Sequence, residues 1–219
     1  MVNHTVQLIN NNAVDGIREV IARNIWVDCI ITKFDMGYFY EDTLEDTLAE
    51  VAQSMSAVLA SDGTVYIQTA FKYIPLVSNI FEHNHLKLQN ILLIPSQYLE
   101  HCKGTCGRMN CYDDNDVNYV LFFSQKCTSP RLLNPLNTDD KACGCKIPSY
   151  WNWFSGSEIA AYRNMMKIST DHGNTVLDPF MNYGDTGVAA IRQDRNYIGI
   201  EVSRARYEDA KRRLQELGE

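Results

Sequence analysis

Hydrophobic and polar positions follow two different periods along this chain. Short β-branched or apolar runs, such as "VDCIIT" at 27–32 and "TVYIQTA" at 64–70, indicate buried strands. Between such runs, apolar residues return every three or four positions, as Leu48, Val51 and Met55 do. That spacing places them on one side of a helix and predicts an amphipathic helix packed against a sheet.

The whole chain divides into elements of these two kinds. The predicted strands cover residues 5–10, 27–32, 64–70, 86–96, 117–125, 175–180 and 196–202. The predicted helices cover residues 13–24, 43–60, 73–84, 157–169, 186–194 and 204–217. Gly63 is expected to end the second of these helices. The alternation predicts an α/β fold with a doubly wound, mostly parallel sheet, in which one strand near the late hairpin runs in the reverse direction.

One stretch departs from both periods. Residues 126–154 are rich in Pro, Asn, Cys and Asp without an apolar repeat, and we expect a long loop excursion there. Otherwise residues 1–219 have the length of a single domain with a full core.

Composition and charge limit the environment and the partners. The chain is 45% hydrophobic and 21% charged, and it has no apolar run long enough to span a membrane. Its start, "MVNHTVQLINNN", lacks the layout of a secretory signal, so a cytoplasmic location is expected. The formal net charge is −7 and the basic residues are scattered, which argues mildly against tight DNA binding through a basic patch. The carboxy-terminal "RARYEDAKRRL" is interpreted as a solvated helix face.

The seven cysteines are expected to be thiols, because disulfides are rare where no secretory signal is present. Cys102, Cys106, Cys143 and Cys145 form C-x3-C and C-x-C spacings rather than the paired C-x2-C of zinc ribbons. Free thiols without a metal are therefore the preferred interpretation, and a structural metal bound by these four cysteines stays open as the alternative.

The most informative segment begins at residue 175. "TVLDPFMNYGDTGVAA" is a strand, a turn of small residues and a helix start, and "NYIGIEV" is a second strand that ends in an acid, Glu201. This is the layout of a mononucleotide-binding unit, in which backbone approaches the ligand at the turn and the acid binds ribose hydroxyls.

This segment resembles the cofactor-binding end of the amino-methylating DNA methyltransferases, which use S-adenosylmethionine (SAM) to methylate N6 of adenine or N4 of cytosine. The family writes D-P-F-x-G-S-G-T-T-G-x-A-A, then I-G-I-E, then Y-x-x-A-x-x-R-L. The matching residues are Asp178, Pro179, Phe180, Gly184, Thr186, Gly187, Ala189, Ala190, Ile198, Gly199, Ile200, Glu201, Tyr207, Ala210, Arg213 and Leu214.

The resemblance implies a Rossmann-like fold of the SAM-dependent methyltransferase type, in the permuted order with the catalytic segment before the cofactor segment. It implies SAM as cofactor. The cofactor-binding residues that it implies are Asn12, Asp178, Pro179, Phe180, Asn182, Gly184, Thr186 and Glu201. Asn12 stands where the family has an Asp that contacts the adenine. Asn182 replaces a family glycine, and Asn is the non-glycine residue that best tolerates a left-handed backbone.

The family's catalytic tetrapeptide, D/N/S-P-P-Y, corresponds to "KFDM" here. In the family, its first residue and a proline carbonyl accept hydrogen bonds from the target amine, and its aromatic ring stacks on a flipped base. Lys33 puts a donor where an acceptor is needed. Phe34 or Tyr38 can offer a stacking face, and Asp35 an acceptor if the loop has slid.

Two functions fit these departures. The first is a SAM-dependent amino-methyltransferase with a divergent catalytic motif, acting on DNA or on another nucleobase-containing substrate. The second is an inactive protein of this fold that binds a protein or nucleic-acid partner, with Lys33 filling the substrate pocket and pairing with Asp35 or Asp185. A homodimer is compatible with either function, since many relatives pair through helices.

Overall fold

The structure is a computed structural model that describes residues 4–34, 43–95, 117–126, 129–130 and 158–217. Its strands are β1 (Val6–Ile9), β2 (Val27–Lys33), β3 (Leu59–Thr69), β4 (Leu86–Pro95), β5 (Val117–Gln125), β6 (Thr175–Asp178) and β7 (Asn196–Ile200). Its helices are α1 (Ala13–Ala22), α2 (Leu44–Val58), the 3-10 turn η3 (Phe71–Tyr73), α3 (Ile74–His83), α4 (Glu158–Ser169), α5 (Asp185–Ile191) and α6 (Arg204–Gln215).

The strands form one seven-stranded sheet in the order β1-β7-β6-β2-β3-β5-β4. The pairs from β1 through β3 are parallel, whereas β5 runs antiparallel to both of its neighbours, β3 and β4. The predicted doubly wound, mostly parallel sheet with one reversed strand is therefore confirmed.

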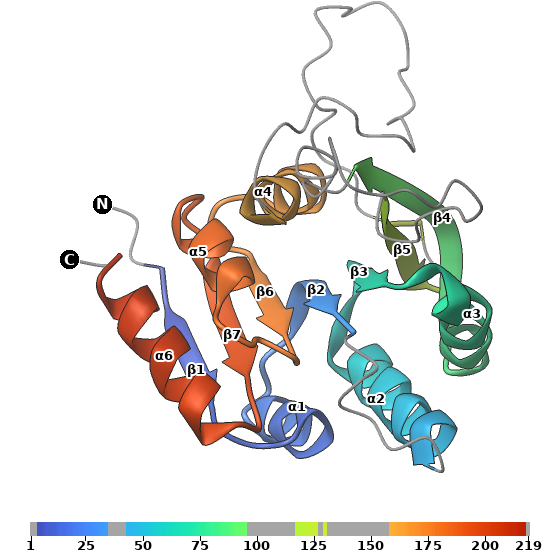
Figure 1. Cartoon of the computed structure of the whole chain (residues 1–219), viewed down its shortest axis with the longest axis horizontal. Coiled ribbons are helices and arrows are strands. Elements are labelled where there is room, and N and C mark those ends of the chain that lie inside the picture. The colour runs from blue at the N-terminus through green and yellow to red at the C-terminus, as the bar shows by residue number, and fades with distance from the viewer. Residues whose placement is uncertain (1–3, 35–42, 96–116, 127–128, 131–157, 218–219) are drawn as a thin grey trace, which may run out of the picture.

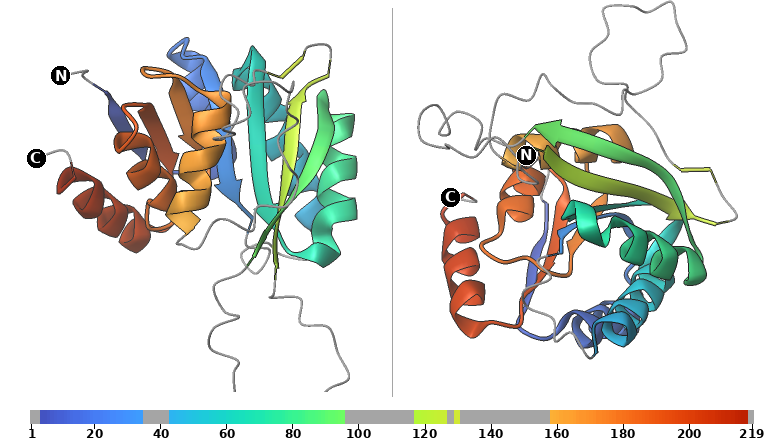
Figure 2. Two further views of the ribbon diagram at one scale, coloured as in Figure 1. Left: turned by 90° about the horizontal axis from the view of Figure 1, so that it is seen from above. Right: turned by 45° about the vertical axis from the view of Figure 1, so that its right-hand side comes forward.

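Helices cover both faces of this sheet (Figures 1 and 2). Helices α1, α2 and α3 lie on one face, and α4, α5 and α6 lie on the other. Successive side chains of a strand point to opposite faces, so each face has its own core. In β2, Ile30 packs into the core under α1–α3, while Cys29 and Ile31 pack into the core under α4–α6. A strand buried on both sides needs a continuous apolar run, and "CIIT" provides one.

The expected end of the second helix is corrected. Helix α2 ends at Val58 rather than at Gly63, and Leu59 already has extended backbone angles. Leu59 pairs with Val27 of β2 and is 2% exposed. Burial in the sheet therefore outweighs the helical spacing that includes this leucine.

Several expectations fall outside the described residues. These are most of the predicted excursion at 126–154 and the cysteines Cys102, Cys106, Cys143 and Cys145. Among the described helices, none is long and apolar enough to cross a membrane.

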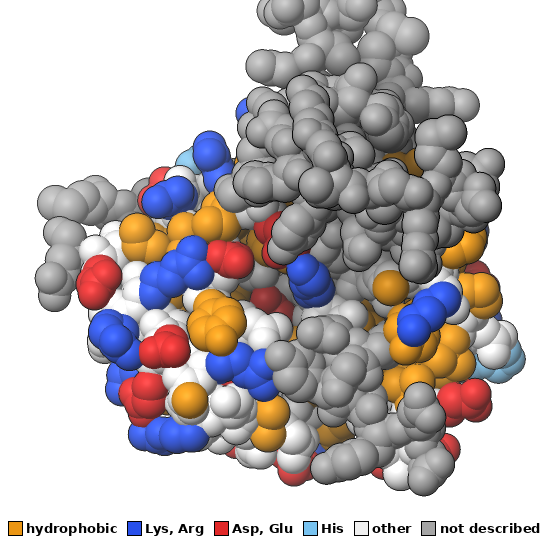
Figure 3. Space-filling view, in the orientation of Figure 1, with side chains coloured by type: hydrophobic (Ala, Val, Ile, Leu, Met, Phe, Trp, Pro, Cys, Tyr) orange, Lys and Arg blue, Asp and Glu red, His pale blue; other side chains and the backbone are white. Residues whose placement is uncertain are grey.

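Basic and acidic side chains alternate over α5 and α6 (Figure 3). Arg204 pairs with Glu208, and Arg212 lies 2.6 Å from Asp209. These two pairs lie on an exposed face of the carboxy-terminal helix, as the sequence predicted, whereas Arg206 and Arg213 pair with acids outside the helix.

Candidate functional site

The site lies at the carboxyl edge of the sheet, between β6 and β2. From β6 the chain passes through α5 to β7, and from β2 it passes through α2 to β3 on the other side. Because the two connections leave in opposite directions and cover opposite faces, a crevice opens between the ends of β6 and β2. Ligands of doubly wound folds bind at such a switch point.

A cavity of about 530 Å³ opens at this edge. It is bounded by α1, α2, the end of β2, the turn after β6 and the end of β7. Its lining residues include Asn12, Ala13, Arg18, Lys33, Glu50, Pro179, Phe180, Asn182, Glu201, Val202 and Arg206. The volume falls within the roughly 300–1,000 Å³ of small-molecule sites.

The turn after β6 has the backbone that its sequence predicts. Asn182 has φ 50°, in the left-handed region, and Gly184 has φ 83° where α5 begins. The Asn182 side chain donates to the Phe180 carbonyl at 3.2 Å, which holds the turn closed. The prediction that asparagine supports a left-handed turn here is confirmed, and the turn brings the backbone to the cavity wall.

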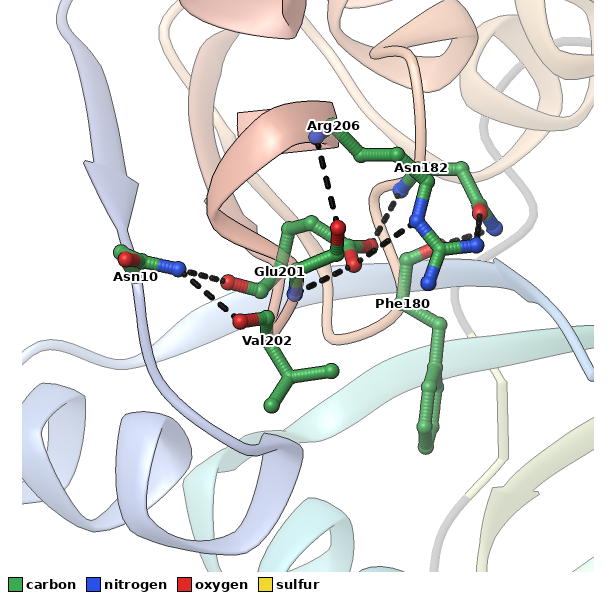
Figure 4. Close-up of polar contacts among 7 residues, drawn as sticks. Asn10, Phe180, Asn182, Glu201, Val202 and Arg206 are labelled. Carbon is green, nitrogen blue, oxygen red and sulfur yellow. Dashed lines mark hydrogen bonds and ion pairs between the residues drawn. The ribbon is translucent and has the colours of Figure 1, made fainter. Parts of the chain in front are cut away.

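Glu201 closes the floor of the cavity at the end of β7. Its side chain is 5% exposed. Oε2 accepts from the Asn182 amide at 3.0 Å, and Oε1 accepts from the Ser203 amide at 2.8 Å. Figure 4 shows this carboxylate between Asn182 and Arg206, whose Nε lies 3.2 Å from Oε1. A buried carboxylate held by two backbone amides is fixed in one orientation, which suits a specific hydroxyl contact.

Arg206 is a cavity residue that sequence reasoning missed. It extends from the first turn of α6, pairs with Glu201, and donates through Nη1 to the Asn182 side chain at 3.2 Å. Its side chain is only 19% exposed, so the ion pair is largely shielded from water. In the sequence Arg206 is one of several arginines in a charged helix, and only its distance from Glu201 in space distinguishes it.

The strand that precedes α1 is tied to the same loop. Asn10 donates through Nδ2 to the carbonyls of Glu201 and Val202, at 2.7 and 3.2 Å. Asn12 then caps α1, with its side chain accepting from the Asp15 amide at 2.9 Å. The Asn12 side chain therefore holds the start of α1 while it lines the cavity.

Asp178 and Thr186 lie beneath the turn rather than on the cavity wall. Asp178 is 3% exposed and accepts from the Thr32 hydroxyl at 2.8 Å and from the Phe180 amide at 3.1 Å. Burial raises the pKa of Asp178 to about 6, against the lowering effect of hydrogen bonds from Thr186 and Thr32. In this structure Asp178 supports the turn, and Pro179 and Phe180 present its surface to the cavity.

Phe34, the second residue of the catalytic corner, does not provide the stacking face that the sequence offered. The Phe34 ring is 3% exposed and packs against Phe81 and Phe180, at 5.9 and 5.2 Å between ring centroids. It lies in the core and presents no stacking face, because the rings of Phe81 and Phe180 pack against it. Asp35 and Tyr38 lie outside the described residues.

Lys33 is paired with Glu158 rather than with Asp185, and the other predicted partner, Asp35, lies outside the described residues. The Nζ of Lys33 lies 2.6 Å from Oε1 of Glu158, at the start of α4. Helix α4 packs over β2, so Glu158 at its start can reach Lys33. Asp185 begins α5 and pairs with Arg213 of α6 instead, at 2.7 Å. Glu158 is a second residue that sequence reasoning missed, since it begins α4, a whole helix before the recognisable segment at residue 175.

Within the described ranges of the structure, no group of three or more His, Cys, Asp or Glu side chains is placed to hold a metal ion.

Three comparisons place this geometry among known proteins. Residues 159–212 match a family model described as DNA methylase. The Type II methyltransferase M2.MboI of Moraxella bovis is 24% identical over 174 residues, which is 73% of this chain and 62% of that protein. M.HpaI of Haemophilus parainfluenzae is 25% identical over 95% of this chain and 74% of that protein. This chain therefore spans less than two thirds of M2.MboI.

The crystal structure of the M1.HpyAVI–SAM complex superposes with a TM-score of 0.75 at 21% identity, covering 96% of this chain and 99% of that one. The fold is thus that of the SAM-dependent methyltransferases. Within that class, the chain is similar to DNA methylases over residues 159–212 and to Type II methyltransferases over most of its length.

Proposed function

We propose that this chain binds SAM in the cavity beside Glu201 and methylates an exocyclic amino group of adenine or cytosine in DNA. The observation that carries the proposal is the oriented, buried carboxylate of Glu201 beside the left-handed turn at Asn182. The family match and the relatives support the reaction class, because each of the relatives named above is a methyltransferase.

The residues of the cavity suit SAM. Oε2 of Glu201 accepts a hydrogen bond from the Asn182 amide. An ionised carboxylate offers about four acceptor sites, so Oε2 can still accept from a ribose hydroxyl. Phe180 and Val202 give apolar walls for an adenine ring, and Asn12 offers an amide at the same wall. SAM would supply an electrophilic methyl group, and the chain would hold the cofactor and orient the amine.

A second candidate function is favoured by the catalytic corner. Lys33 is engaged with Glu158, and Phe34 is inside the core, so the described half of the "KFDM" segment lacks the family's acceptor and stacking ring. An inactive protein that keeps the cavity and binds a protein or nucleic-acid partner is consistent with this corner. A homodimer is compatible with both functions, and light scattering of the purified chain would test it.

Calorimetric titration with SAM and with S-adenosylhomocysteine tests cofactor binding. We expect saturable binding that Glu201→Ala weakens by about 10-fold or more, because the mutation removes a charge-assisted hydrogen bond. Glu208→Ala is the matched control, since Glu208 is an acid of α6 that pairs with Arg204 on the surface. Absence of heat at millimolar SAM would refute the proposal for the cofactor.

A labelled methyl-transfer assay on unmethylated DNA then separates the two functions. Transfer to adenine or cytosine supports the enzyme. Cofactor binding without transfer to any unmethylated DNA supports the inactive binding protein instead.

A further inference from the structure

The ion pair at the catalytic corner belongs to a larger polar cluster. Glu158 accepts from Lys33 at 2.6 Å and from Nε2 of Gln68 at 3.4 Å. Gln68 also donates to Asn118 at 2.9 Å and accepts from the Tyr162 hydroxyl at 3.2 Å. These five residues come from β2, β3, β5 and α4.

Strand alternation explains why they meet. Cys29 and Ile31 of β2 point toward α4, so Lys33, two positions further on, lies on the same face. Tyr66 of β3 packs there too, which places Gln68 on that face by the same argument. The cluster is therefore on the α4 side of the carboxyl edge, and Lys33 reaches from it to the cavity wall.

The cluster contains two buried residues, Gln68 and Tyr162, and a partly exposed ion pair, Lys33 and Glu158, which we call the open pair. Gln68 is 7% exposed and Tyr162 is 4% exposed. The side chains of Lys33 and Glu158 are 45% and 38% exposed. Tyr162 stays protonated, because burial raises its pKa well above the ordinary value, and its hydroxyl fixes the orientation of the Gln68 amide. A rigid buried set thus holds a donor and an acceptor side by side at the surface.

Counted over the described residues, Lys33 has donor sites and Glu158 has acceptor sites beyond those that their contacts use. A lysine ammonium carries three donors, and Glu158 is the acceptor that Lys33 meets among the described residues. A carboxylate offers about four acceptor sites, and Lys33, Gln68 and Tyr162 account for at most three at Glu158. A planar ligand edge with an acceptor beside a donor can therefore bond to both side chains at once.

We propose that Lys33 and Glu158 recognise the substrate base of this protein, with Lys33 donating to the ring nitrogen and Glu158 accepting from the adjacent exocyclic amino group. Adenine and cytosine both present that acceptor–donor edge, whereas hypoxanthine and uracil present it reversed. The inference rests on the proposed function for its substrate class. It also gives the site an acceptor for the target amine, delivered from α4 rather than from the tetrapeptide, and Glu158 balances the charge of Lys33.

The test measures the preference for an amino-bearing base. Fluorescently labelled oligothymidylate strands carry a single different base at the centre. One pair of strands compares adenine with hypoxanthine, the other compares cytosine with uracil, and fluorescence anisotropy gives the Kd of each strand. A bidentate contact to a base edge discriminates between bases by about 5- to 150-fold in affinity. Because the side chains of Lys33 and Glu158 are partly exposed to water, we expect the amino-bearing strand to bind about 5-fold more tightly. Glu158→Gln and Lys33→Met are each expected to bring the ratio close to 1.

The ratio of affinities separates recognition from a merely structural or electrostatic role. Loss of Glu158 leaves Lys33 without its counter-charge and strengthens binding to every strand alike, which does not alter the ratio. Asp209→Asn is the matched control, because Asp209 and Arg212 form an exposed pair of the same 2.6 Å length on α6. This variant should keep the wild-type preference.

Two outcomes overturn the proposal. One is a wild-type protein with no measurable preference for the amino-bearing strands. The other is a preference that survives unchanged in both Glu158→Gln and Lys33→Met, with melting temperatures showing that the variants fold. SAM titration is run separately. A base preference without cofactor binding counts against the proposed function. Cofactor binding without a base preference counts against this inference alone.

Discussion

Asn182 shows how one residue adapts the cofactor turn without breaking it. Its φ of 50° is a conformation that glycine adopts freely and that costs most other residues about 1–2 kcal/mol. The amide side chain offsets part of this cost through its bonds to the Phe180 carbonyl and to Arg206. The substitution therefore keeps the backbone geometry and adds a polar contact to the cavity wall.

Replacing this residue tests the argument. Asn182→Ala should lower the free energy of unfolding by about 1–2 kcal/mol, because alanine keeps the strain and loses both side-chain bonds. Asn182→Gly should cost less, since glycine relieves the strain. Urea denaturation of the two variants measures the difference, and equal losses would show that backbone strain is not the deciding factor.

Asp178 makes stability depend on pH in the unusual direction for a carboxylic acid. Its pKa rises from 3.8 when exposed to about 6 in the folded chain, chiefly through burial. Between these values the folded state holds more protons than the unfolded state, so this group's contribution to stability falls as pH rises from about 4 to about 6.

Asp178→Asn removes this titration while keeping the size of the side chain. The stability of the wild type relative to the variant should fall by at most about 3 kcal/mol between pH 4 and pH 7. Denaturant melts of both proteins across that range give the difference at each pH. A difference that is constant with pH would mean that Asp178 is not buried as the structure shows.

At the scale of elements, the central strands are buried on both faces. Ile30 and Ile31 are adjacent in β2, and their exposed fractions are 0% and 1%. Ile30 packs in the core under α1–α3, and Ile31 packs in the core under α4–α6. Two neighbouring residues of one strand therefore pack against two different helical layers, one on each face of the sheet.

Truncating each isoleucine should be about equally costly. Ile30→Ala and Ile31→Ala should each lower the free energy of unfolding by about 2–5 kcal/mol, because each leaves a cavity in a closed core. Val6→Ala in the edge strand β1 is the control, since Val6 is 38% exposed and should lose less than about 1 kcal/mol. Tolerance at one of the two isoleucines would show that its helical layer is loosely packed.

At the scale of the whole molecule, stability and ligand binding are linked. A ligand that binds only the folded chain adds about 2.7 kcal/mol at 100 times its Kd. For a chain of 219 residues this amounts to a melting temperature raised by roughly 5–10 °C. We expect S-adenosylhomocysteine to produce such a shift in the wild type and in Glu208→Ala, and a much smaller shift in Glu201→Ala. An equal shift in all three proteins would place the ligand elsewhere.

The sequence by itself determined the alternation of strands and helices, the doubly wound class of the sheet and the turn after β6, because these depend on local periodicity and on residues close together in the chain. It also indicated Glu201 and the left-handed Asn182. The pairing of Lys33 with Glu158 joins residues 125 positions apart, and no local pattern predicts it. Arg206 reaches Glu201 from the first turn of α6, and Phe34 is buried because Phe81 and Phe180 pack against it. Packing of the sheet against its two helical layers decided these contacts, and with them which side chains line the site.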